Sequence, residues 1–580
     1  MKVLVIGGVA GGMSAATRLR RLDEQAEIVV LERGAHVSYA NCGLPYYLGG
    51  VIEERAALLL QTPESLAARF RIDVRVRQEA VAVDPAARTV RVREVASGRE
   101  YEEAYDKLVL SPGATPFVPP LPGVERARTL RDVTDVDRLA ADLAAGARSA
   151  VVVGGGFIGV EAAENLRERG LDVTLIELAD QVLPPLDPEM AAPVAERLRA
   201  HGVRVELGAQ AAEVLPDAVT LADGRRVPAD VVLMSIGVRP ETGLARAAGL
   251  ELGERGGIAV DASMRTSDPD IYAVGDAAEK RDAQTGEPVL IPLANLANRH
   301  GRLVADAIAG REVRARAASG TAVVQVFELT AAATGWNEKR LRAAGRPYEA
   351  VHLHPGSHAG YYPGASPIAL KVLFDPQDGR ILGAQAVGED GVDKRIDVIA
   401  TAMAGGLTAP ELAELELAYA PPYGSAKDPV TMAGFIAENR MNGTARAVQW
   451  HEVGDEGAAS GAAVIDVRTP AEHARGAIPG AVNIPLDELR ARAAELPPGD
   501  LIVHCQVGLR GHNAQRLLAG LGRESANLDG GYATWAAGQS ARGAGRPARA
   551  AGGSASAAGG SASAVDPTAD ASQLTAPQTA

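Results

Sequence analysis

The chain has 580 residues, of which 47% are hydrophobic, so it is expected to form several domains instead of a single core. Its 59 basic and 73 acidic residues give a formal net charge of −14, which excludes a generally basic surface and hence a nucleic-acid or anionic-lipid partner. It has only two cysteines, which excludes a disulfide framework and favours a reducing, cytoplasmic environment.

The apolar start of the chain, Val3 to Ile6, is followed at once by glycines, which favours a first strand over a signal peptide. No apolar run reaches the ~18 residues that a membrane-spanning helix needs, so we expect no membrane association.

The first motif is a strand, a glycine-rich turn and a helix. Residues 2–6 are predicted to form a buried strand and residues 14–22 a helix, with Gly7 to Gly12 between them. A second strand over 28–31 ends at Glu32, twenty residues after Gly12, where a carboxylate can bind ribose hydroxyls. Because Val9 replaces the middle glycine of G-x-G-x-x-G, the motif alone predicts either a dinucleotide site or a structural turn.

The stretch from Ser38 to Tyr47 contains the first cysteine, Cys42. A dithiol flavoenzyme would carry its second cysteine at position 47, which is a tyrosine here. Residues 43–50 are predicted to begin a short helix, and the amides and dipole of a helix N-terminus stabilise a thiolate. Cys42 is therefore a candidate nucleophile that needs a partner from outside its loop. The alternative is a small, buried apolar residue, as many free cysteines are.

A second copy of the glycine fingerprint occupies residues 150–169. A strand over 150–153 leads into Gly154 to Gly159, which has the full glycine spacing, and a helix is predicted over 161–169. Glu177 ends the next strand eighteen residues after Gly159, and its charge favours the free ribose hydroxyls of NADH over the 2′-phosphate of NADPH. Two fingerprints in one chain predict two bound dinucleotides. Further strands end in small-residue turns at 111–116 and 275–277, and Asp276 is expected to face the polyol of a ligand.

From residue 1 to about residue 442 the chain resembles the flavoprotein disulfide reductases that have two dinucleotide sites. Within them, Ser38 to Tyr47 resembles the single-cysteine branch, which contains coenzyme A disulfide reductase, NADH oxidase and NADH peroxidase. The resemblance implies FAD on the first fingerprint, NADH on the second and a dimerisation domain, and hence a homodimer. It disfavours peroxide chemistry, because the glycine loop from Gly8 to Gly11 lacks the histidine of the peroxidases.

The resemblance also implies the residues that bind each dinucleotide. The implied FAD ligands are Gly7, Gly8, Ala10, Gly11, Gly12, Glu32, Arg33, Asn41, Cys42, Gly113 and Asp276. The implied NADH ligands are Gly154, Gly156, Phe157, Ile158, Gly159, Glu177 and Gly237.

A coenzyme A site follows from the same resemblance. Arg18 and Arg21 lie on one face of the first predicted helix, where guanidinium groups can hold phosphates, although solvated arginines have the same spacing. Tyr361 and Tyr419 would reach the partner subunit's Cys42 and donate protons to the departing thiolate; without the resemblance, tyrosines beside prolines are typical of turn packing. The implied coenzyme A ligands are Ser14, Arg18, Arg21, Ser38, Asn41 and Lys427.

The last ordered part of the chain resembles a rhodanese domain, on Asp466-Val467-Arg468 and on the loop from Cys505 to Arg510. In such a loop a strand ends at the cysteine and successive backbone amides point at the sulfur, which stabilises a thiolate or a persulfide. Cys505 and Arg510 are therefore candidate catalytic residues. Phosphatases with a similar loop have one more residue before the arginine, a place that Gly511 takes here, so phosphate chemistry is the weaker interpretation. A rhodanese fold that only binds partners would usually lack the cysteine.

We therefore expect an α/β protein with two Rossmann-like dinucleotide-binding domains, for FAD and NAD(P), an α+β dimerisation domain and a C-terminal α/β rhodanese domain, and no metal site. The expected ranges are 1–112 and 245–320 for FAD, 113–244 for NADH, 321–442 for dimerisation, 443–461 for a polar, glycine-rich linker, 462–541 for the rhodanese domain and 542–580 for a disordered tail.

The expected activity is reduction of coenzyme A disulfide, coenzyme A persulfide or polysulfide by NADH through FAD and Cys42, with Cys505 relaying sulfane sulfur. Coenzyme A would be either the bound substrate or the mixed-disulfide partner that Cys42 lacks. One alternative is a water-forming NADH oxidase that cycles Cys42 through sulfenic acid. The other is a non-enzymatic redox sensor whose rhodanese domain only binds partners.

Overall fold

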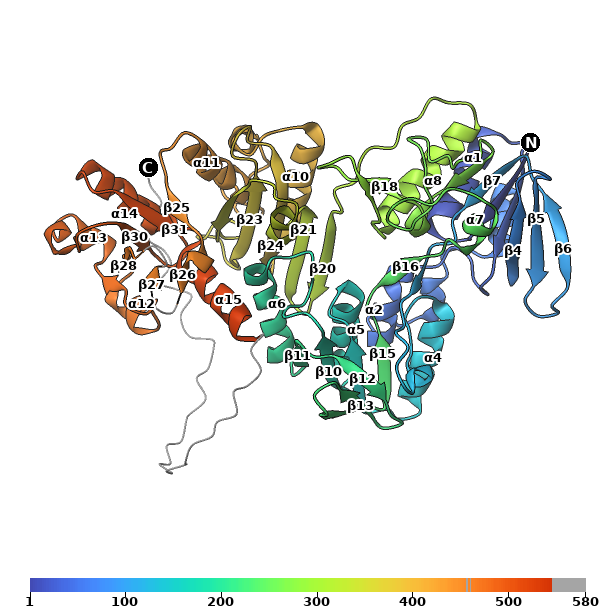
Figure 1. The fold of residues 1–580 in the computed structure, drawn as a ribbon, viewed down its shortest axis with the longest axis horizontal. Helices are drawn as coiled ribbons and strands as arrows, with labels where there is room; N and C mark the ends of the chain where they lie inside the picture. Colours follow the sequence, from blue (N-terminus) through green and yellow to red (C-terminus); the bar gives the residue numbers. More distant parts are fainter. Residues whose placement is uncertain (455–456, 459–460, 545–580) are drawn as a thin grey trace. The chain divides into compact units, whose positions relative to one another are not determined.

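The computed structural model describes residues 1–454, 457–458 and 461–544 (Figure 1). The chain divides into two compact units, Met1–Ala179 with Leu198–Gly320, and Asp180–Arg197 with Thr321–Ala580. The expected disordered tail lies outside the described residues from residue 545 onward, whereas Arg542 to Ala544 complete the last helix. Among the described residues, no helix combines the length and the apolar character that crossing a membrane requires.

The first unit begins with the expected strand, turn and helix. Its main sheet has five parallel strands, in the order β17 (Ile271–Ala273), β7 (Lys107–Leu110), β1 (Lys2–Ile6), β2 (Glu27–Glu32) and β3 (Asp73–Val76). The side chains of β1 from Val3 to Val5 are almost completely buried, as expected for a central parallel strand. Helix α1 (Ala10–Leu22) begins earlier than the predicted residue 14, because the glycine turn leads directly into it.

Helix α8 (Ala294–Ile308) packs along α1 in this unit. The two helices approach closely, since a Cβ atom added at Gly301 would lie 2.2 Å from the carbonyl oxygen of Gly11. The remaining elements around this sheet are an antiparallel sheet, a short hairpin and three helices. They are β4 (Gln78–Asp84), β5 (Thr89–Glu94), β6 (Glu100–Ala104), β18 (Lys280–Arg281), β19 (Pro288–Val289), α2 (Leu44–Gly49), α3 (Pro63–Phe70) and α7 (Gly243–Ala247).

The second glycine fingerprint lies in a separate parallel sheet of the same unit. Its strands are β11 (Arg204–Leu207), β10 (Asp172–Glu177), β9 (Ser149–Val153) and β15 (Val231–Met234), and helix α5 (Phe157–Glu168) follows β9. Around it lie α4 (Val133–Ala144), the antiparallel strands β12 (Ala211–Val214), β13 (Ala218–Leu221) and β14 (Arg226–Pro228), and the pair β8 (Ala114–Pro116) and β16 (Val238–Pro240). Both Rossmann-like domains are thus confirmed.

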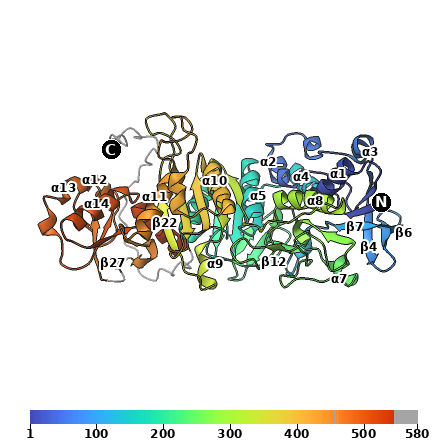
Figure 2. The same ribbon diagram turned by 90° about the horizontal axis from the view of Figure 1, so that it is seen from above.

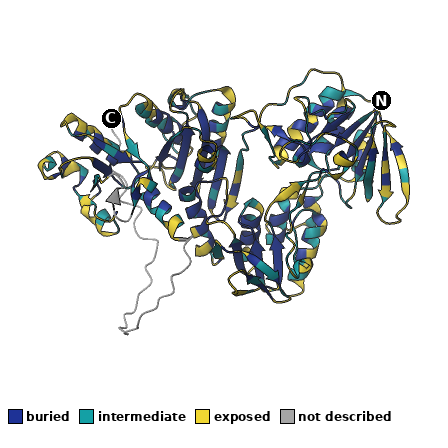
Figure 3. Cartoon of the chain, viewed as in Figure 1, coloured by how far each residue is buried: buried dark blue, intermediate teal, exposed yellow. Residues whose placement is uncertain are grey.

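The second unit contains the dimerisation domain, an antiparallel sheet covered by helices. The strands lie in the order β20 (Ala322–Val326), β21 (Leu329–Gly335), β24 (Ile381–Gly388), β23 (Ile368–Phe374) and β22 (Glu349–Leu353). The helices are α6 (Pro188–Ala200), α9 (Glu338–Ala343), α10 (Val392–Gly405) and α11 (Pro429–Met441). Helix α11 packs beside β22 (Figure 2). Every residue of β24 is buried, which places the core of the domain around this central strand (Figure 3).

The rhodanese domain is a five-stranded parallel sheet with helices, as expected. Its strands are β25 (Ala447–Val448), β31 (Ser525–Leu528), β30 (Leu501–His504), β28 (Ala463–Asp466) and β29 (Val482–Asn483), in that order. Its helices are α12 (Pro470–Ala474), α13 (Leu486–Leu489), α14 (Leu509–Gly520) and α15 (Gly531–Ala544).

The structure corrects the expected linker over 443–461. Strand β25 pairs with β31 and so forms one edge of the rhodanese sheet. Trp450 is only 7% exposed and packs in a hydrophobic cluster with Val453 and Trp535. A Cβ atom at Gly538 would lie 2.2 Å from the Trp450 ring, so this glycine makes room for the indole. The expected linker is therefore largely part of the rhodanese domain.

The structure also regroups Asp180–Arg197, which the expected NADH range of 113–244 included. This segment belongs to the second unit. The physical reason is a set of ion pairs, because Asp187 and Glu189 both contact the ammonium group of Lys371 in β23.

Candidate active site

The first glycine turn forms a cradle of backbone whose space would be filled if its glycines carried side chains. Gly7 has a φ of 101°, and a Cβ atom there would lie 2.0 Å from the carbonyl oxygen of Ser111. A Cβ atom at Gly12 would lie 2.0 Å from the carbonyl oxygen of Gly7. The amide of Gly8 donates a hydrogen bond of 2.8 Å to Glu32, so the carboxylate stands at the edge of the turn. This arrangement fits a dinucleotide whose ribose contacts Glu32 and whose phosphates lie over the helix N-terminus.

The turns after β7 and β17 meet at this cradle. A Cβ atom at Gly11 would lie 2.9 Å from both the Ser111 hydroxyl oxygen and a methyl group of Val274. Asp276 follows β17 and is half-buried. Burial raises the pKa of its carboxyl group, and the positive charges of Lys280 and Arg131 oppose that change. The expected FAD ligands Gly113 and Asp276 thus belong to loops at the carboxyl ends of neighbouring strands, which is where such sheets bind ligands.

The second fingerprint repeats the geometry of the first. Gly154 has a φ of 111°, and a Cβ atom at Gly159 would lie 1.8 Å from the Gly154 carbonyl oxygen. Glu177 accepts a hydrogen bond of 2.6 Å from the Gly155 amide, as Glu32 does from Gly8. A Cβ atom at Gly156 or Gly237 would meet nothing within 4 Å, so open space borders both glycines. The residues present therefore fit a second dinucleotide.

Cys42 lies in a single helical turn, Asn41–Gly43, directly before α2, and its side chain is exposed. The sequence predicted a stabilised thiolate at Cys42, but the surroundings of Cys42 disfavour its ionised form. Partial loss of hydration raises the pKa of the thiol, and the negative charges of Glu161 and Asp276 raise it further. These effects outweigh the backbone at the helix N-terminus.

Glu161 is a residue whose charge acts on Cys42 and that sequence reasoning missed. It lies in the first turns of α5, and its carboxylate accepts a hydrogen bond of 3.3 Å from the Tyr46 hydroxyl of α2. Burial raises the pKa of Glu161, and burial followed by the charge of Glu161 raises that of Tyr46. The available signal was a carboxylate two residues after the last glycine of the fingerprint.

The expected coenzyme A ligands of the first unit lie on α1 and in the loop before Cys42. Arg18 is already engaged, because its guanidinium group forms an ion pair of 2.8 Å with Asp306. Arg21, by contrast, is exposed. Ser14 donates a hydrogen bond of 2.8 Å to the Asn298 side chain. Two further expected ligands, Ser38 and Asn41, lie in the loop that leads to Cys42. The Ser38 amide donates a hydrogen bond of 2.7 Å to the Gly8 carbonyl oxygen.

In the second unit, Tyr361 and Tyr419 are brought together from positions 58 residues apart. Their hydroxyl oxygens are 2.8 Å apart, and the side chains are exposed by 71% and 49%. The hydrogen bond with Tyr419 raises the pKa of Tyr361. Lys427 is exposed in the segment that precedes α11. The pair can pass a proton between its hydroxyls, which suits the proton donation expected of it.

The rhodanese loop holds the second cysteine at the end of β30. Cys505 is completely buried, and the Gly508 amide donates a hydrogen bond of 3.2 Å to its sulfur. Arg510, the expected catalytic arginine, forms a two-pronged ion pair with Glu472, with distances of 2.9 and 2.6 Å. Glu472 was missed, although its signal was present as the glutamate of a helix-capping box with Thr469.

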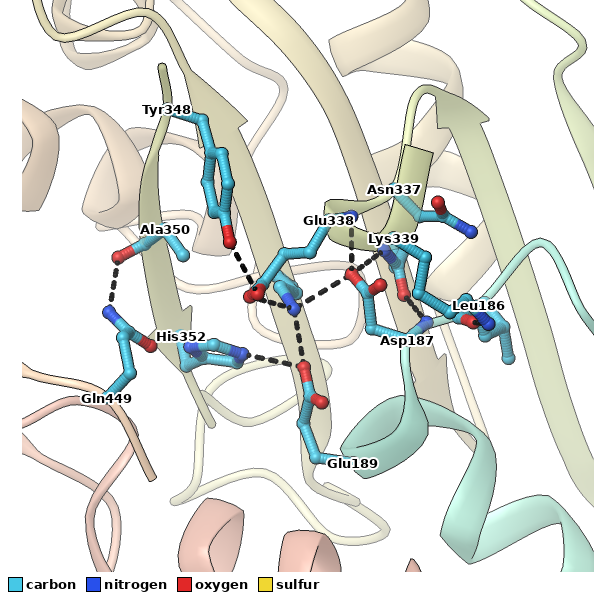
Figure 4. Close-up of polar contacts among 12 residues, drawn as sticks. Leu186, Asp187, Glu189, Asn337, Glu338, Lys339, Tyr348, Ala350, His352 and Gln449 are labelled. Atoms are coloured by element: carbon cyan, nitrogen blue, oxygen red, sulfur yellow. Dashed lines mark hydrogen bonds and ion pairs between the residues drawn. The ribbon is translucent and has the colours of Figure 1, made fainter. Parts of the chain in front are cut away.

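A buried charged cluster was also missed. Lys371 lies in β23 with its ammonium nitrogen 2.8 Å from Asp187, 2.5 Å from Glu189 and 2.6 Å from Glu338. His352 of β22 lies 3.1 Å from Glu189, and Figure 4 shows these two side chains pointing toward one another.

The cluster has the composition of a metal site but holds its own cation. Glu189, Glu338 and His352 place ligand atoms within 4.8 Å of one another. The Lys371 ammonium contacts the same carboxylates, so it supplies the positive charge that a metal ion would supply. Burial and Lys371 lower the pKa of His352, but hydrogen bonds to Asp529 and Glu189 outweigh them and raise it to about 9. The imidazole is therefore a second cation at neutral pH.

Comparisons with known proteins agree with this geometry. Family models match residues 1–301 as a pyridine nucleotide-disulphide oxidoreductase, 321–429 as the dimerisation domain of these enzymes and 450–538 as a rhodanese-like domain. The coenzyme A disulfide reductase of Staphylococcus aureus is 36% identical over 441 residues, which cover 75% of this chain and 100% of the relative.

Two solved structures extend the similarity through the rhodanese domain. Reduced Bacillus anthracis CoADR-RHD has a TM-score of 0.91 and 49% identity, covering 93% of this chain and 98% of its own. The NAD-dependent persulfide reductase from A. fulgidus has a TM-score of 0.87 and 38% identity, covering 92% and 100%. Since these matches run from the first strand into the last helix, we conclude that the chain belongs to the pyridine nucleotide-disulphide oxidoreductase family, whose enzymes use FAD and NADH.

Proposed function

We propose that this enzyme uses NADH to reduce the S–S bond of coenzyme A disulfide, coenzyme A persulfide or a polysulfide. The observation that carries the proposal is the presence of two free cysteines in one chain, the exposed Cys42 in the helical turn before α2 and the buried Cys505 in a rhodanese loop. The relatives support it, because one is named a coenzyme A disulfide reductase and another a persulfide reductase, and both are similar over most of this chain.

In the proposed reaction the thiolate of Cys42 attacks one sulfur of the substrate. A bond forms between the Cys42 sulfur and that half of the substrate, the substrate S–S bond breaks, and the other half leaves as a thiolate that takes a proton. When bound at the first glycine turn, FAD supplies the two-electron link between NADH and the resulting mixed disulfide. The Tyr361 and Tyr419 pair is proposed to protonate the leaving thiolate at the partner subunit's Cys42.

The remaining roles are proposed from position. The glycine turns with Glu32 and Glu177 hold the two dinucleotides, and Ser14, Arg21, Ser38, Asn41 and Lys427 are the proposed coenzyme A ligands, with Arg18 available only if its ion pair opens. A homodimer is proposed because the dimerisation model matches and the tyrosine pair is exposed. The cytoplasm is proposed as the location, because both thiols are free and the exchange requires reduced thiols.

An anaerobic substrate panel tests the proposed function. Oxidation of NADH with coenzyme A disulfide, coenzyme A persulfide and polysulfide should consume one NADH for each S–S bond broken. Admission of oxygen should add little NADH oxidation. If oxygen uptake accounts for the NADH consumed and no sulfur substrate increases the rate, the enzyme is a water-forming NADH oxidase instead.

Glu177 is expected to set the preference for NADH. A carboxylate near the 2′-phosphate of NADPH costs on the order of 1 kcal/mol in a partly screened site, which predicts a roughly tenfold preference for NADH. Arg167, a residue that could offset this repulsion, is held by the carbonyl oxygens of His201 and Leu171. The ratio of kcat/KM for the two nucleotides should fall toward one in Glu177→Gln and stay unchanged in the exposed control Glu168→Gln. Equal use of NADPH by the wild type would contradict this role.

Cys505→Ala is expected to impair sulfur transfer through Cys505 while leaving disulfide reduction at Cys42 intact. Coenzyme A disulfide can reach the exposed Cys42 directly, so its reduction should continue at nearly the wild-type rate. Sulfur from donors that first load Cys505 should be transferred at least about a hundredfold more slowly, because the accepting thiolate is gone. Initial rates with both kinds of substrate measure the difference. If the variant transfers sulfur from such donors at the wild-type rate, the relay is refuted.

A further inference from the structure

The rhodanese domain is joined to the dimerisation domain through one buried aspartate. Asp529 directly follows β31 and is 3% exposed. One of its carboxylate oxygens accepts hydrogen bonds from the His352 backbone amide, at 2.8 Å, and from the His352 ring nitrogen Nδ1, at 2.7 Å. The other oxygen accepts a hydrogen bond of 2.9 Å from Arg440 of α11. Two of the residues that bind the Asp529 carboxylate, His352 and Arg440, thus come from the dimerisation domain, while Gln449 adds a longer hydrogen bond of 3.4 Å from the rhodanese side.

The two domains leave no space at this junction. Gly530 has a φ of 67°, and a Cβ atom there would lie 2.0 Å from the Thr534 hydroxyl oxygen and 2.8 Å from the His352 Cβ atom. The Thr534 hydroxyl lies 2.7 Å from the ring nitrogen Nε2 of His354, which is a second residue of the dimerisation domain in contact with α15. Residues of the dimerisation domain therefore contact the side chains at both ends of the segment 529–534.

The same backbone supports the loop of the rhodanese cysteine. The Tyr532 amide donates to the Cys505 carbonyl oxygen at 2.8 Å, and the Ala533 amide donates to the Gln506 carbonyl oxygen at 2.9 Å. A Cβ atom at Gly531 would lie 2.6 Å from the Cys505 carbonyl oxygen and 2.7 Å from the Gly508 nitrogen. Because the Gly508 amide binds the Cys505 sulfur, a shift of 529–533 would move the donor that stabilises the thiolate.

We propose that His352 and Asp529 are positioning residues for sulfur transfer at Cys505, so that the dimerisation domain completes the rhodanese active loop. This inference rests on the proposed role of Cys505. With thiosulfate as donor, the Cys505 thiolate bonds the outer sulfur, sulfite leaves with the electron pair of the broken S–S bond, and cyanide then takes the outer sulfur as thiocyanate and restores the thiolate. His352 touches none of the reacting atoms and acts through Asp529 and the loop.

Two substitutions of His352 separate its two side-chain contacts. Asparagine places an amide nitrogen near the position of Nδ1, so His352→Asn keeps a donor for Asp529 and loses the contact with Glu189. Glutamine places its amide near Nε2, so His352→Gln keeps Glu189 and loses Asp529. Both variants remove the same positive charge, so they are matched in charge and differ in which side-chain contact they keep.

The test measures thiocyanate formation by the full-length holoenzyme. We expect kcat to fall at least about tenfold in His352→Gln with little change in the KM for thiosulfate, and to stay within about twofold of wild type in His352→Asn. Release of sulfite when thiosulfate loads Cys505 should slow in His352→Gln alone. Reduction of coenzyme A disulfide through Cys42 should be unchanged in both. Ser540→Ala, which removes a 2.8 Å contact between α15 and Glu196 of α6 away from the loop, should behave as wild type.

The possible outcomes test the positioning role of His352 separately from the proposed role of Cys505. A wild-type enzyme that forms no thiocyanate with any sulfane donor refutes the role of Cys505 itself. Equal transfer rates in His352→Gln and His352→Asn refute the positioning role, as does a loss that follows thermal stability across all variants. If the His352 variants do not fold, Asp529→Asn provides the same test through the ratio of the Cys505 rate to the Cys42 rate, and an unchanged ratio refutes the positioning role.

Discussion

Replacing Cys42 with serine should abolish NADH-dependent reduction of disulfides and persulfides while FAD stays bound. A serine hydroxyl is not ionised near neutral pH and cannot form a mixed disulfide, so turnover should fall by about a thousandfold or more. Cys42 is among the implied FAD ligands, but its side chain is not among the atoms that close on the glycine turn, which include the Ser111 hydroxyl oxygen, a Val274 methyl group and the backbone of the turn itself. The rate of NADH consumption and the flavin absorbance of the purified variant measure the two effects.

The matched control for this substitution is Cys505→Ala, which removes the other thiol and should retain reduction of coenzyme A disulfide. Near-normal turnover of Cys42→Ser would remove Cys42 from the mechanism. A mass measurement examines the partner of this thiol separately. Wild-type protein kept from reductants should carry the added mass of coenzyme A at Cys42, and a bare thiol in every preparation would contradict coenzyme A as the resident partner.

Replacing Lys371 with methionine should destabilise the second unit more than any surface substitution. The ammonium group is completely buried among Asp187, Glu189 and Glu338, and it lowers the pKa of Glu338 against the effect of burial. Removing one partner of a buried ion pair costs about 3–5 kcal/mol, because the remaining charges lose their compensation. Chemical denaturation or thermal unfolding followed in the full-length protein measures the change.

The pH dependence of this variant gives a second test. A carboxyl group whose pKa is lowered in the folded state stabilises the wild type above the pKa of the unfolded chain, and this stabilisation is lost as the pH falls. Without Lys371, burial raises the pKa of Glu189 and Glu338 and only the weaker effect of His352 opposes it, so the variant gains relative stability as the pH falls. The difference in stability should therefore narrow from pH 8 toward pH 5. Lys394→Met, at a half-exposed lysine 3.8 Å from Asp428, should cost less than about 1 kcal/mol. Similar losses in both variants would contradict the role of the buried cluster.

The two glycine fingerprints could be predicted from the sequence because their geometry is local. Gly7 and Gly154 need a positive φ, and Gly12 and Gly159 face the carbonyl oxygens of those same residues, so a few neighbouring positions determine each turn. The glutamates that receive amide hydrogen bonds in these turns follow at the end of the next strand. The α/β fold class follows from the same units.

The predictions that failed concern residues whose surroundings come from distant parts of the chain. The expected linker contains Trp450, whose burial depends on Gly538 far along the chain. The pKa of Cys42 is raised by burial and then by the charges of Glu161 and Asp276, which a local rule about helix ends does not consider. Lys371 and Asp187 are separated by 184 residues, and no local pattern marks either as a member of a buried cluster. Sequence spacing alone does not show which charges will be enclosed together.

The junction at Asp529 bears on how this enzyme could be divided for engineering. A fused domain is often treated as an independent module that can be excised at its boundary or exchanged for a homologue. Here, excision before Ala447 would leave the Asp529 carboxylate without His352 and Arg440, and the backbone under the sulfur loop without its outer support. A transplant of this domain would therefore need to bring β22 and α11 with it, so the smallest portable piece spans both domains.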